Sequence, residues 1–430
     1  MSASCDSYNN KDRNPKVKIL QLGYGKMGKA VLDDLVKTAQ FDELVLADAG
    51  PNFASEAAGI ADPRIKSVRL DVNDRPGLLA LMKGADIVVE LLPVRYTMQV
   101  AQAAVEAGVH MVSSVFIIDW SIQDPEGVRR QQEQMAEIDS KAKAKGLTVL
   151  KEFGMDPGLD LVIAGQTVRQ LDEVKVLYTY GAGFPEHRLS RANPIGYKFT
   201  WSIVDAMCSY AIPGRILKNG RAQDIPADGM FTPGNFHMLD LKEMGGPLEC
   251  FVNGDGESLA RLFPSIAASA TTLGRFICRW PGHAAFWEKM VKCGFNRTEP
   301  VKVNGVDVVP AAFCAALLGS QPQFHYGCGE RDVALIRADA RGTLKGKPVR
   351  AIGQLVDYRD LTTGFTAMQR TVAFPMSIGA QMIMDGRLSM RGIVEPSQVP
   401  YEPVAAELRK RGLEITQRTE TWDGSVEQGA

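Results

Sequence analysis

Three glycines near the N-terminus have the spacing of a dinucleotide-binding loop. Gly23, Gly25 and Gly28 form the pattern Gly-x-Gly-x-x-Gly between an apolar run at 17–22 and an amphipathic segment from 29 to about 39. The first glycine permits a tight turn, the second lets the backbone approach a pyrophosphate, and the third lets a helix pack on the strand. Because a strand precedes the loop and a helix follows it, the free N–H groups of the helix start point at the phosphates. We therefore predict that a dinucleotide contacts Gly23, Tyr24, Gly25, Lys26, Met27 and Gly28.

An acidic residue at the end of the next strand bears on which dinucleotide binds. Asp48 ends the strand-like run 44–48, roughly 20 residues after Gly28, where a carboxylate holds the adenosine ribose. It would accept a hydrogen bond from the ribose 2′-OH and repel a 2′-phosphate. The residues that follow, 49–51, include no Lys or Arg. We therefore predict NAD rather than NADP; the alternative for the whole loop is a turn of this kind that holds no nucleotide.

Further cofactor contacts are expected where the later strands end, because an open α/β sheet binds its ligand beyond the carboxyl ends of its strands. Asp71 is a candidate for the adenine side. Pro93 is a candidate for the wall near the nicotinamide, although a proline at this point also serves simply to end a strand. The residues predicted to bind the cofactor at these ends are Asp71, Val72, Leu92, Pro93, Ser113 and Ser114.

The turn 154–158, Gly-Met-Asp-Pro-Gly, follows the sixth strand-like run and carries one carboxylate. Oxidation of an amine needs little more than a group that manages protons and charged residues that hold the substrate. Asp156 is the best-placed residue of this kind, as a proton handler or as the holder of an ammonium group. The alternative is a plain turn residue, since Asp-Pro-Gly is a common turn former.

The pattern of strands and helices predicts an α/β fold with two sheets. Strands alternate with helices of roughly ten residues up to 158, which predicts a doubly wound parallel sheet of the Rossmann type. Beyond 173 the runs become amphipathic and hairpin-like, with Asn304-Gly305 as the clearest turn. We predict a flexible tail at 1–15, a dinucleotide-binding domain at 16–158, an α+β substrate and dimerisation domain with a mixed or antiparallel sheet at 159–372, and a segment at 373–430 that packs back on the first domain.

Composition excludes several classes of function. The formal net charge is −1, so no global field recruits nucleic acid or an anionic membrane. No apolar run approaches the roughly 20 residues of a membrane span, and the N-terminus lacks an apolar signal-peptide core. The seven cysteines include no CxxC pair and the five histidines are scattered. We therefore predict no metal site and a location in the reducing cytoplasm.

Several motifs resemble a known family. The junction 152–160, Glu-Phe-Gly-Met-Asp-Pro-Gly-Leu-Asp, resembles the Gly-Leu-Asp-Pro-Gly-Ile-Asp signature of the saccharopine dehydrogenases. The segment 193–202, Asn-Pro-Ile-Gly-Tyr-Lys-Phe-Thr-Trp-Ser, is similar to that family's Asn-Pro-Leu-Gly-Tyr-Lys-Phe-Ser-Trp-Ser. Shorter similarities at 181–185, 278–282 and 357–371 extend the resemblance over nearly the whole chain.

This resemblance implies reversible hydride transfer between a nicotinamide and an amine or imine carbon of a lysine-derived amino acid. It implies that Met155, Asp156 and Pro157 contact both cofactor and substrate. It also implies that Arg279 holds a substrate carboxylate, which a bidentate guanidinium does well, and that the enzyme is a homodimer. The remaining substrate residues that it implies are Phe116, Tyr197, Lys198 and Trp201, with core packing as the alternative for Tyr197 and Trp201.

Departures from the family pattern point to a smaller or less anionic substrate than saccharopine. The glutamate-forming reductases carry Asn-Arg-Asp-Ser where this chain has Asn253-Gly254-Asp255, without the arginine that binds a saccharopine carboxylate. At Phe116 the family has a tyrosine, so a hydroxyl contact is also missing. We therefore predict an NAD-dependent enzyme similar to lysine 6-dehydrogenase. The alternatives are a saccharopine reductase, a relative that acts on another amino acid or a polyamine imine, and a non-catalytic NAD-binding sensor.

Overall fold

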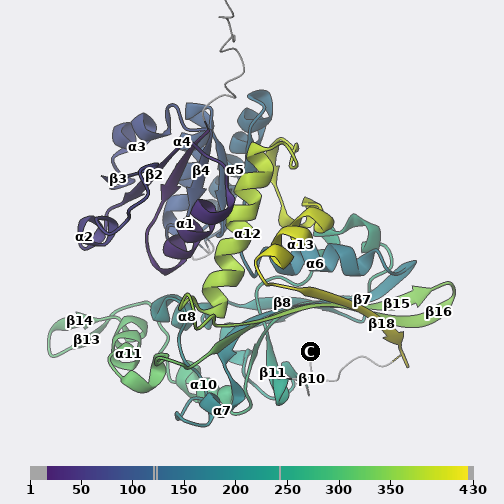
Figure 1. Cartoon of the computed structure of the whole chain (residues 1–430). Coiled ribbons are helices and arrows are strands. Elements are labelled where there is room, and N and C mark those ends of the chain that lie inside the picture. Colours follow the sequence, from purple (N-terminus) through teal and green to yellow (C-terminus); the bar gives the residue numbers. More distant parts are fainter. Residues whose placement is uncertain (1–16, 120–121, 123, 242–243, 425–430) are drawn as a thin grey trace, which may run out of the picture.

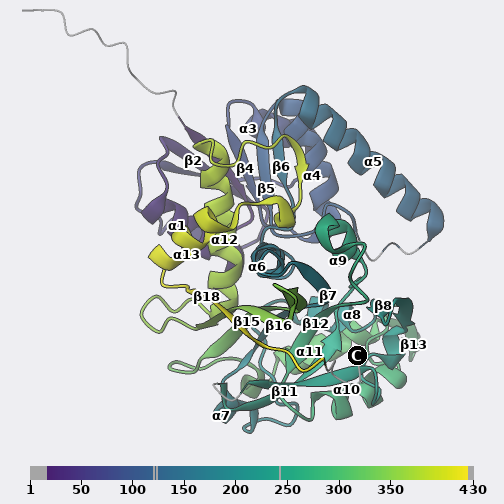
Figure 2. The ribbon, with the colours of Figure 1, turned by 90° about the vertical axis from the view of Figure 1, so that its right-hand side faces the viewer.

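Two β-sheets, one above the other in Figure 1, form the framework of the protein. The structure is a computed structural model that describes residues 17–119, 122, 124–241 and 244–424. The predicted flexible tail at 1–15 lies outside the described residues. Helices α6 (Leu159–Val168) and α12 (Ala367–Met384) lie between the two layers, as Figures 1 and 2 show from two directions.

The first sheet has seven strands, and every pairing in it is parallel. The strand order is that of a doubly wound dinucleotide-binding sheet. From β1 the chain adds β2 and β3 on one side, and then crosses to add β4 and the later strands on the other side. The strands, in spatial order, are β3 (Ile65–Arg69), β2 (Glu43–Asp48), β1 (Lys18–Leu22), β4 (Ile87–Glu90), β5 (His110–Ser113), β6 (Thr148–Leu150) and β17 (Gly392–Val394).

Alternating apolar residues on these strands explain why helices cover both faces of the first sheet. Leu20 and Val88 pack with helices on one side, and Ile19 and Val89 pack with helices on the other. The first side is covered by α3 (Arg75–Met82), α4 (Val94–Ala107) and α5 (Pro125–Ala144), and the second by α1 (Lys26–Thr38) and α12, with the short α2 (Phe53–Ala57) after β2.

The second sheet has nine strands and is mixed, because β12 runs parallel to β7 while the other neighbours are antiparallel. Its main path is β10 (Phe236–Leu241), β11 (Gly246–Val252), β12 (Thr272–Arg279), β7 (Glu173–Pro185), β15 (Asp332–Leu344), β16 (Lys347–Tyr358) and β18 (Ile415–Thr421). Two further strands, β8 (Gly214–Lys218) and β9 (Arg221–Ile225), extend it from β12. This mixed sheet and the parallel sheet above it confirm the predicted α/β architecture.

Short helices and one separate hairpin complete the second layer. The hairpin β13 (Val301–Val303) and β14 (Val306–Val308) turns at Asn304-Gly305, where both residues have positive φ, as the Asn-Gly pair predicts. The remaining helices are α7 (His187–Ser190), α8 (Ile203–Ser209), α9 (Ser258–Leu262), α10 (His283–Lys292), α11 (Pro310–Gly319) and α13 (Tyr401–Lys410).

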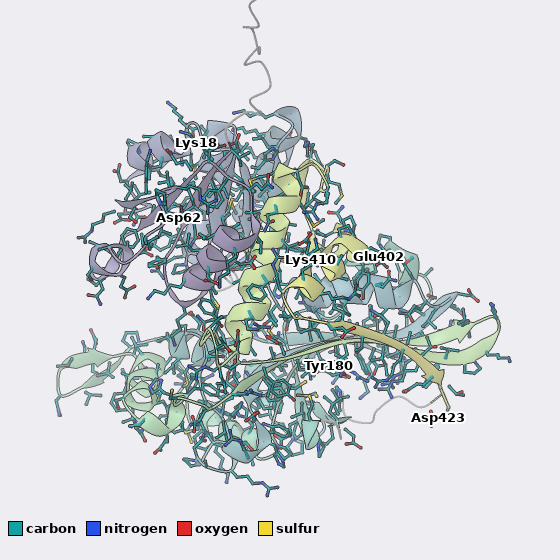
Figure 3. The ribbon with its side chains drawn as sticks, viewed as in Figure 1. Lys18, Asp62, Tyr180, Glu402, Lys410 and Asp423 are labelled. Carbon is teal, nitrogen blue, oxygen red and sulfur yellow. The ribbon has the colours of Figure 1, made fainter. Side chains whose placement is uncertain are left out.

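The C-terminal segment returns to the first sheet, as predicted, and then leaves it again. Strand β17 pairs with β6 at the edge of the first sheet, whereas β18 pairs with β16 in the second. Side chains from both layers share one apolar core, which includes Leu35 of α1, Ile163 of α6 and Ile378 of α12. On the far side of the second sheet, Tyr180 (labelled in Figure 3) belongs to a second aromatic core.

Candidate functional site

The glycine loop has the shape that a pyrophosphate requires. A Cβ at Gly28 would come 2.2 Å from the carbonyl oxygen of Gly23, and one at Gly23 would come 2.8 Å from the carbonyl oxygen of Leu91. A Cβ at Gly25, in contrast, would meet nothing within 4 Å. Gly25 is also the N-cap of α1, and no side chain caps that helix start. The N–H groups there are free for an anion, so the loop fits a dinucleotide.

Asp48 holds the glycine loop in place. Its carboxylate accepts hydrogen bonds from the backbone N–H of Tyr24 at 2.7 Å and from that of Gly50 at 2.6 Å. Arg69 of β3 is the residue directly beside Asp48 across the strand pair. Within the described part of the chain its exposed guanidinium has no ion-pair partner. Arg69 was missed from the sequence because this basic residue comes from the neighbouring strand and not from the residues that follow Asp48.

The residues that were predicted to bind the cofactor follow the carboxyl ends of the parallel strands, so they lie at the same end of the first sheet. Asp71 and Pro93 are exposed, Leu92 and Ser114 are half-buried, and the side chain of Val72 is buried in the core. Val72 can therefore reach a ligand only through its backbone.

A buried carboxylate that the sequence analysis missed, Glu90, joins two of these strand ends. Ser113 donates its hydroxyl to Glu90 at 2.6 Å, and the backbone N–H of Leu92 donates to the same carboxylate at 3.0 Å. Burial raises the pKa of Glu90 to about 7. The sequence held a signal for this residue, because a glutamate inside the apolar run 87–92 places a carboxyl group in the core.

Asp156 lies in a buried cluster of charges where the two layers meet. Arg275 of β12 donates through one nitrogen to Asp156 at 2.7 Å and to Asp160 of α6 at 2.9 Å. Asn253 donates its amide to the other oxygen of Asp156 at 3.1 Å. A Cβ at Gly181 would lie 2.2 Å from the Cβ of Asp156, so only glycine at this point of β7 admits the turn. Asp160 and Asn253 stand in the motifs described above but no role was predicted for them, and Arg275 was not predicted at all.

Arg279 is buried four residues further along β12, on the same face of the sheet as Arg275. Its side chain is 5% exposed, it lies 4.6 Å over the ring of Tyr197, and one nitrogen donates to the carbonyl of Cys278 at 2.9 Å. Its Nε has no acceptor, and no carboxylate in the described regions forms an ion pair with it. Glu249, opposite Arg279 on β11, accepts from the N–H groups of Gly282 and Ala284 instead.

The other predicted substrate residues have different surroundings. The hydroxyl of Tyr197 is buried and lacks a partner. Lys198 is already paired, through an ion pair with Glu330 at 2.6 Å and a hydrogen bond to the carbonyl of His325 at 3.0 Å. Trp201 is half-buried against the aromatic core, and Phe116 is half-buried after β5. The structure thus brings Tyr197 and Arg279 together and engages Lys198 elsewhere.

The start of helix α12 connects the second sheet to the glycine loop. Asp332 of β15 accepts hydrogen bonds from the N–H groups of Ala367 and Met368 at 2.8 and 3.0 Å. Gln369 donates its side-chain amide to the carbonyl of Lys26 at 2.8 Å. A Cβ at Gly183 would lie 2.4 Å from the end of Met368, so β7 and α12 also meet. No sequence signal relates these residues, because they come from distant parts of the chain.

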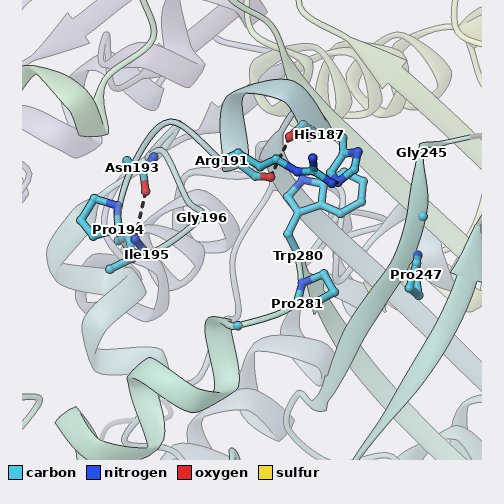
Figure 4. A pocket seen from close by; sticks show the side chains of 13 residues that line it. His187, Arg191, Asn193, Pro194, Ile195, Gly196, Gly245, Pro247, Trp280 and Pro281 are labelled. Carbon is cyan, nitrogen blue, oxygen red and sulfur yellow. Dashed lines mark hydrogen bonds between the residues drawn. The ribbon is translucent and has the colours of Figure 1, made fainter.

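A cavity of about 510 Å³ lies elsewhere, near α7 and the end of β12. Figure 4 shows His187, Arg191 and Trp280 in the middle of its lining, with Asn193, Pro194 and Ile195 on one side of them and Gly245 and Pro247 on the other. None of the predicted site residues lines this cavity.

Fold and site together define a class of protein, in which a Rossmann sheet with a dinucleotide-binding glycine loop lies beside a mixed sheet that supplies charged side chains. Two family models match the chain. The saccharopine dehydrogenase NADP binding domain matches residues 19–150, and the saccharopine dehydrogenase C-terminal domain matches residues 154–413. The chain therefore belongs to the saccharopine dehydrogenase family.

Individual relatives are similar over nearly the whole chain. The bovine mitochondrial alpha-aminoadipic semialdehyde synthase is 26% identical over 93% of this chain, which spans 48% of that protein's length. The glutamate-forming, NADP(+) saccharopine dehydrogenase of Schizosaccharomyces pombe is 22% identical, with 92% of this chain and 98% of the relative covered. The apo saccharopine dehydrogenase (L-Glu forming) of Saccharomyces cerevisiae has the same fold, with a TM-score of 0.77 at 20% identity over 94% of this chain and all of that one.

Two negative observations complete the description. No described helix is both long enough and apolar enough to cross a membrane. Within the same described residues, no group of three His, Cys, Asp or Glu side chains is arranged to hold a metal ion.

Proposed function

We propose that this protein is a nicotinamide-dependent dehydrogenase of the saccharopine type, which oxidises a secondary amine between an amino-acid side chain and a second amino acid. In this direction the products are an aldehyde and a free amino acid such as glutamate. The similarity to glutamate-forming saccharopine dehydrogenases over both domains supports the proposal.

The observation that carries the proposal is the pair of unbalanced charges on one face of the second sheet. A buried cation without an anionic partner is costly, so Arg279 calls for a group such as a carboxylate. At Asp156 the imbalance is opposite, because one guanidinium faces two carboxylates, which favours a cation such as a protonated amine. The four residue steps from Arg275 to Arg279 span about 13 Å of strand. A substrate with a carboxylate at one end and an amine several bonds away fits this arrangement.

Each side chain then has a defined task. When bound, the nicotinamide accepts a hydride from the carbon next to the substrate nitrogen. Arg279 holds the carboxylate with Tyr197 against its guanidinium, and burial together with the charge of Arg279 lowers the pKa of His283, which keeps that neighbouring imidazole neutral. Asp156 faces the substrate nitrogen and accepts its proton. Asn253 and Arg275 hold the Asp156 carboxylate in one orientation.

For the cofactor we propose NADP in place of the NAD that Asp48 suggested. The matching family model is an NADP binding domain, and relatives such as the Schizosaccharomyces pombe enzyme are named as NADP(+) enzymes. Because both oxygens of Asp48 already accept backbone hydrogen bonds, its carboxylate is committed to the loop. Arg69 beside it offers a cation for a 2′-phosphate. The Arg69→Ala variant should raise the KM for NADP and leave that for NAD nearly unchanged, whereas equal effects on both would contradict this assignment.

A second candidate, lysine 6-dehydrogenase activity, rests on one residue. Gly254 stands next to Asn253, where the glutamate-forming reductases carry a carboxylate-binding arginine. A Cβ at Gly254 would meet nothing within 4 Å, so open space replaces that arginine. A substrate with fewer carboxylates, such as lysine itself, would suit this space.

A substrate panel tests these functions against each other. Consumption of NADPH with glutamate and aminoadipate semialdehyde is expected, in a reaction that forms the C–N bond. Reduction of NAD or NADP by lysine across pH 7 to 10, without the first reaction, would favour the second candidate. Tight binding of NADPH without turnover of any amine or imine would overturn both and support a cofactor-binding sensor.

We further propose that the enzyme acts as a homodimer in the cytoplasm. The family resemblance supports the dimer, and the described cysteines support a reducing compartment, because they are free thiols even where the sulfurs of Cys250 and Cys278 lie 3.2 Å apart. Light scattering of the purified chain tests the dimer, for which a mass near 94 kDa is expected, about twice the 46.9 kDa of one chain.

A further inference from the structure

The two carboxylates held by Arg275 differ in exposure and in position. Asp160 is completely buried at the start of α6, whereas the Asp156 side chain is 9% exposed at the turn before it. Both lie within 3 Å of the same guanidinium nitrogen, so the two carboxyl groups approach each other as well. Like charges this close do not both ionise freely, and one proton is then shared between them.

We infer that Asp156 and Asp160, bridged by Arg275, form a carboxyl pair that takes up the proton released from the substrate nitrogen. This inference rests on the proposed function, because it assigns the proton acceptor of that reaction. Asp156 touches the substrate. Asp160 and Arg275 are positioning residues: Arg275 holds both carboxyl groups side by side, and Asp160 is the buried member of the pair.

The atoms and electrons of the step balance as follows. A protonated secondary amine gives one N–H proton to the Asp156–Asp160 pair. The adjacent C–H bond then breaks, two electrons and the hydrogen pass to the nicotinamide, and a C=N⁺ double bond forms. Water adds to that bond, the original C–N bond breaks, and an aldehyde and a free amine leave. The nicotinamide cofactor of the proposed function is the oxidant.

Other charged groups around the pair support this assignment. Glu152, Lys151 and Glu395 form a neighbouring chain, in which Lys151 contacts Glu152 at 2.8 Å and Glu395 at 3.1 Å. Arg261 also contacts Glu395, at 3.6 Å, so two cations balance two acids there, whereas Arg275 alone faces two acids and leaves one negative charge in excess. Burial raises the pKa of Asp160, although Arg275 opposes the rise, and the carboxylates raise the pKa of Arg275 against the effect of its burial. Arg275 therefore stays charged while the pair gains or loses its proton.

Two substitutions should move the pH profile of the enzyme in opposite directions. Asp160→Asn removes the buried carboxyl group whose pKa is raised by burial, and Arg275 then serves Asp156 alone. The acid limb of kcat/KM should then shift down by about one pH unit or more. In Arg275→Gln the positive charge is lost, the proton is held more tightly, and the same limb should shift up by a similar amount. Arg275→Lys keeps a charge and should restore most of the wild-type position.

A matched pair elsewhere provides the control. Asp34 of α1 and Arg411 are also buried and joined at 2.8 Å, away from the cluster at Asp156. Asp34→Asn and Arg411→Lys should lower the melting temperature without moving the acid limb. The inference is wrong if Asp160→Asn and Arg275→Lys are folded and active but have the same acid limb of kcat/KM as wild type. It is also wrong if the control variants shift that limb by the same amount.

A second measurement needs no substrate and separates this inference from the proposed function. A pH titration followed by infrared difference spectroscopy should show a protonated-carboxyl band that Asp160→Asn shifts to lower pH and that Asp34→Asn leaves in place. If that band behaves as expected but no panel substrate is turned over, the proposed function fails and the carboxyl pair stands. If wild type turns over and the band does not respond to Asp160→Asn, the pair fails and the function stands.

Discussion

Arg275 and Arg279 show how two identical residues on one strand are used differently. Arg275 has two carboxylates in hydrogen-bond range, whereas Arg279 has a backbone carbonyl, the hydroxyl of Tyr210 and the ring of Tyr197 but no carboxylate among the described residues. A buried guanidinium left in this condition is stabilised chiefly when a ligand supplies the missing anion. Arg275 therefore balances carboxylates of the protein itself, whereas Arg279 is the residue that we expect to bind a carboxylate of the substrate.

Replacement of Arg279 by lysine tests this difference. The ammonium loses the bidentate geometry and the stacking on Tyr197, so kcat/KM should fall by about 100-fold, mainly through KM, since a buried charge pair contributes about 2–5 kcal/mol. Arg215→Lys on β8, where the side chain is exposed, is the control and should leave both constants within about twofold. A normal KM in Arg279→Lys would remove this residue from the substrate site.

Glu90 gives a prediction about stability and pH. Its pKa in the folded state, about 7, lies above the value of 4.5 that it has when exposed. The stability that it contributes is therefore fully present below about pH 4.5 and is lost as the pH rises through 7. Glu90→Gln keeps the hydrogen bonds without the charge. Relative to wild type, it should gain about 2 kcal/mol of unfolding free energy between pH 5 and pH 8, measured by denaturant titration.

The exposed Glu402 of α13 provides the comparison for Glu90. Glu402→Gln should show no such change with pH, because an exposed carboxylate has similar surroundings in both states. If Glu90→Gln and wild type keep a constant difference over the same range, Glu90 is already ionised at low pH and the predicted shift is wrong.

At the scale of elements, the local patterns of the sequence predicted more than the long-range contacts. The glycine loop, the strand ends and the Asn304-Gly305 hairpin follow from spacing within a few residues, because each is a local backbone requirement. The role of Arg275 could not be predicted from local spacing, because its contact with Asp156 is long-range. The two residues meet only when β12 packs under a turn more than a hundred residues away in the chain. Gln369 at the start of α12 reaches the carbonyl of Lys26 in the same way.

Helix α12 also shows why a helical glycine can be required by packing alone. A Cβ at Gly379 would lie 2.7 Å from Phe153 and 2.9 Å from Leu150. Gly379→Ala gains about 1 kcal/mol of helix propensity but overpacks the core, which costs about 1–3 kcal/mol. We therefore expect a net loss and a melting temperature lower by a few degrees. Gly319 at the end of α11 has only the tip of Ile203 nearby, at 3.2 Å, so Gly319→Ala should be neutral or slightly stabilising.

At the scale of the whole molecule, the two predicted domains are not independent. One apolar core includes Leu35 and Leu150 from the first sheet layer, Ala338 from the second, and Ile163 and Ile378 from the helices α6 and α12 between them. Strand β17, which completes the first sheet, comes from the far end of the chain. A protein built in this way should unfold as one unit, because removal of either layer exposes the core of the other.

The isolated fragment 17–158 therefore should not fold, although it contains the whole dinucleotide-binding pattern. It lacks α12 and β17, so the face that carries Leu35, Leu150 and Phe153 would lie open to water and the β6 edge would be unpaired. We expect the fragment to aggregate, or to bind a hydrophobic dye strongly and show no cooperative thermal transition, while the full chain shows a single one. A fragment that melts cooperatively and binds NADPH would contradict the shared core and restore the simple picture of two separate domains.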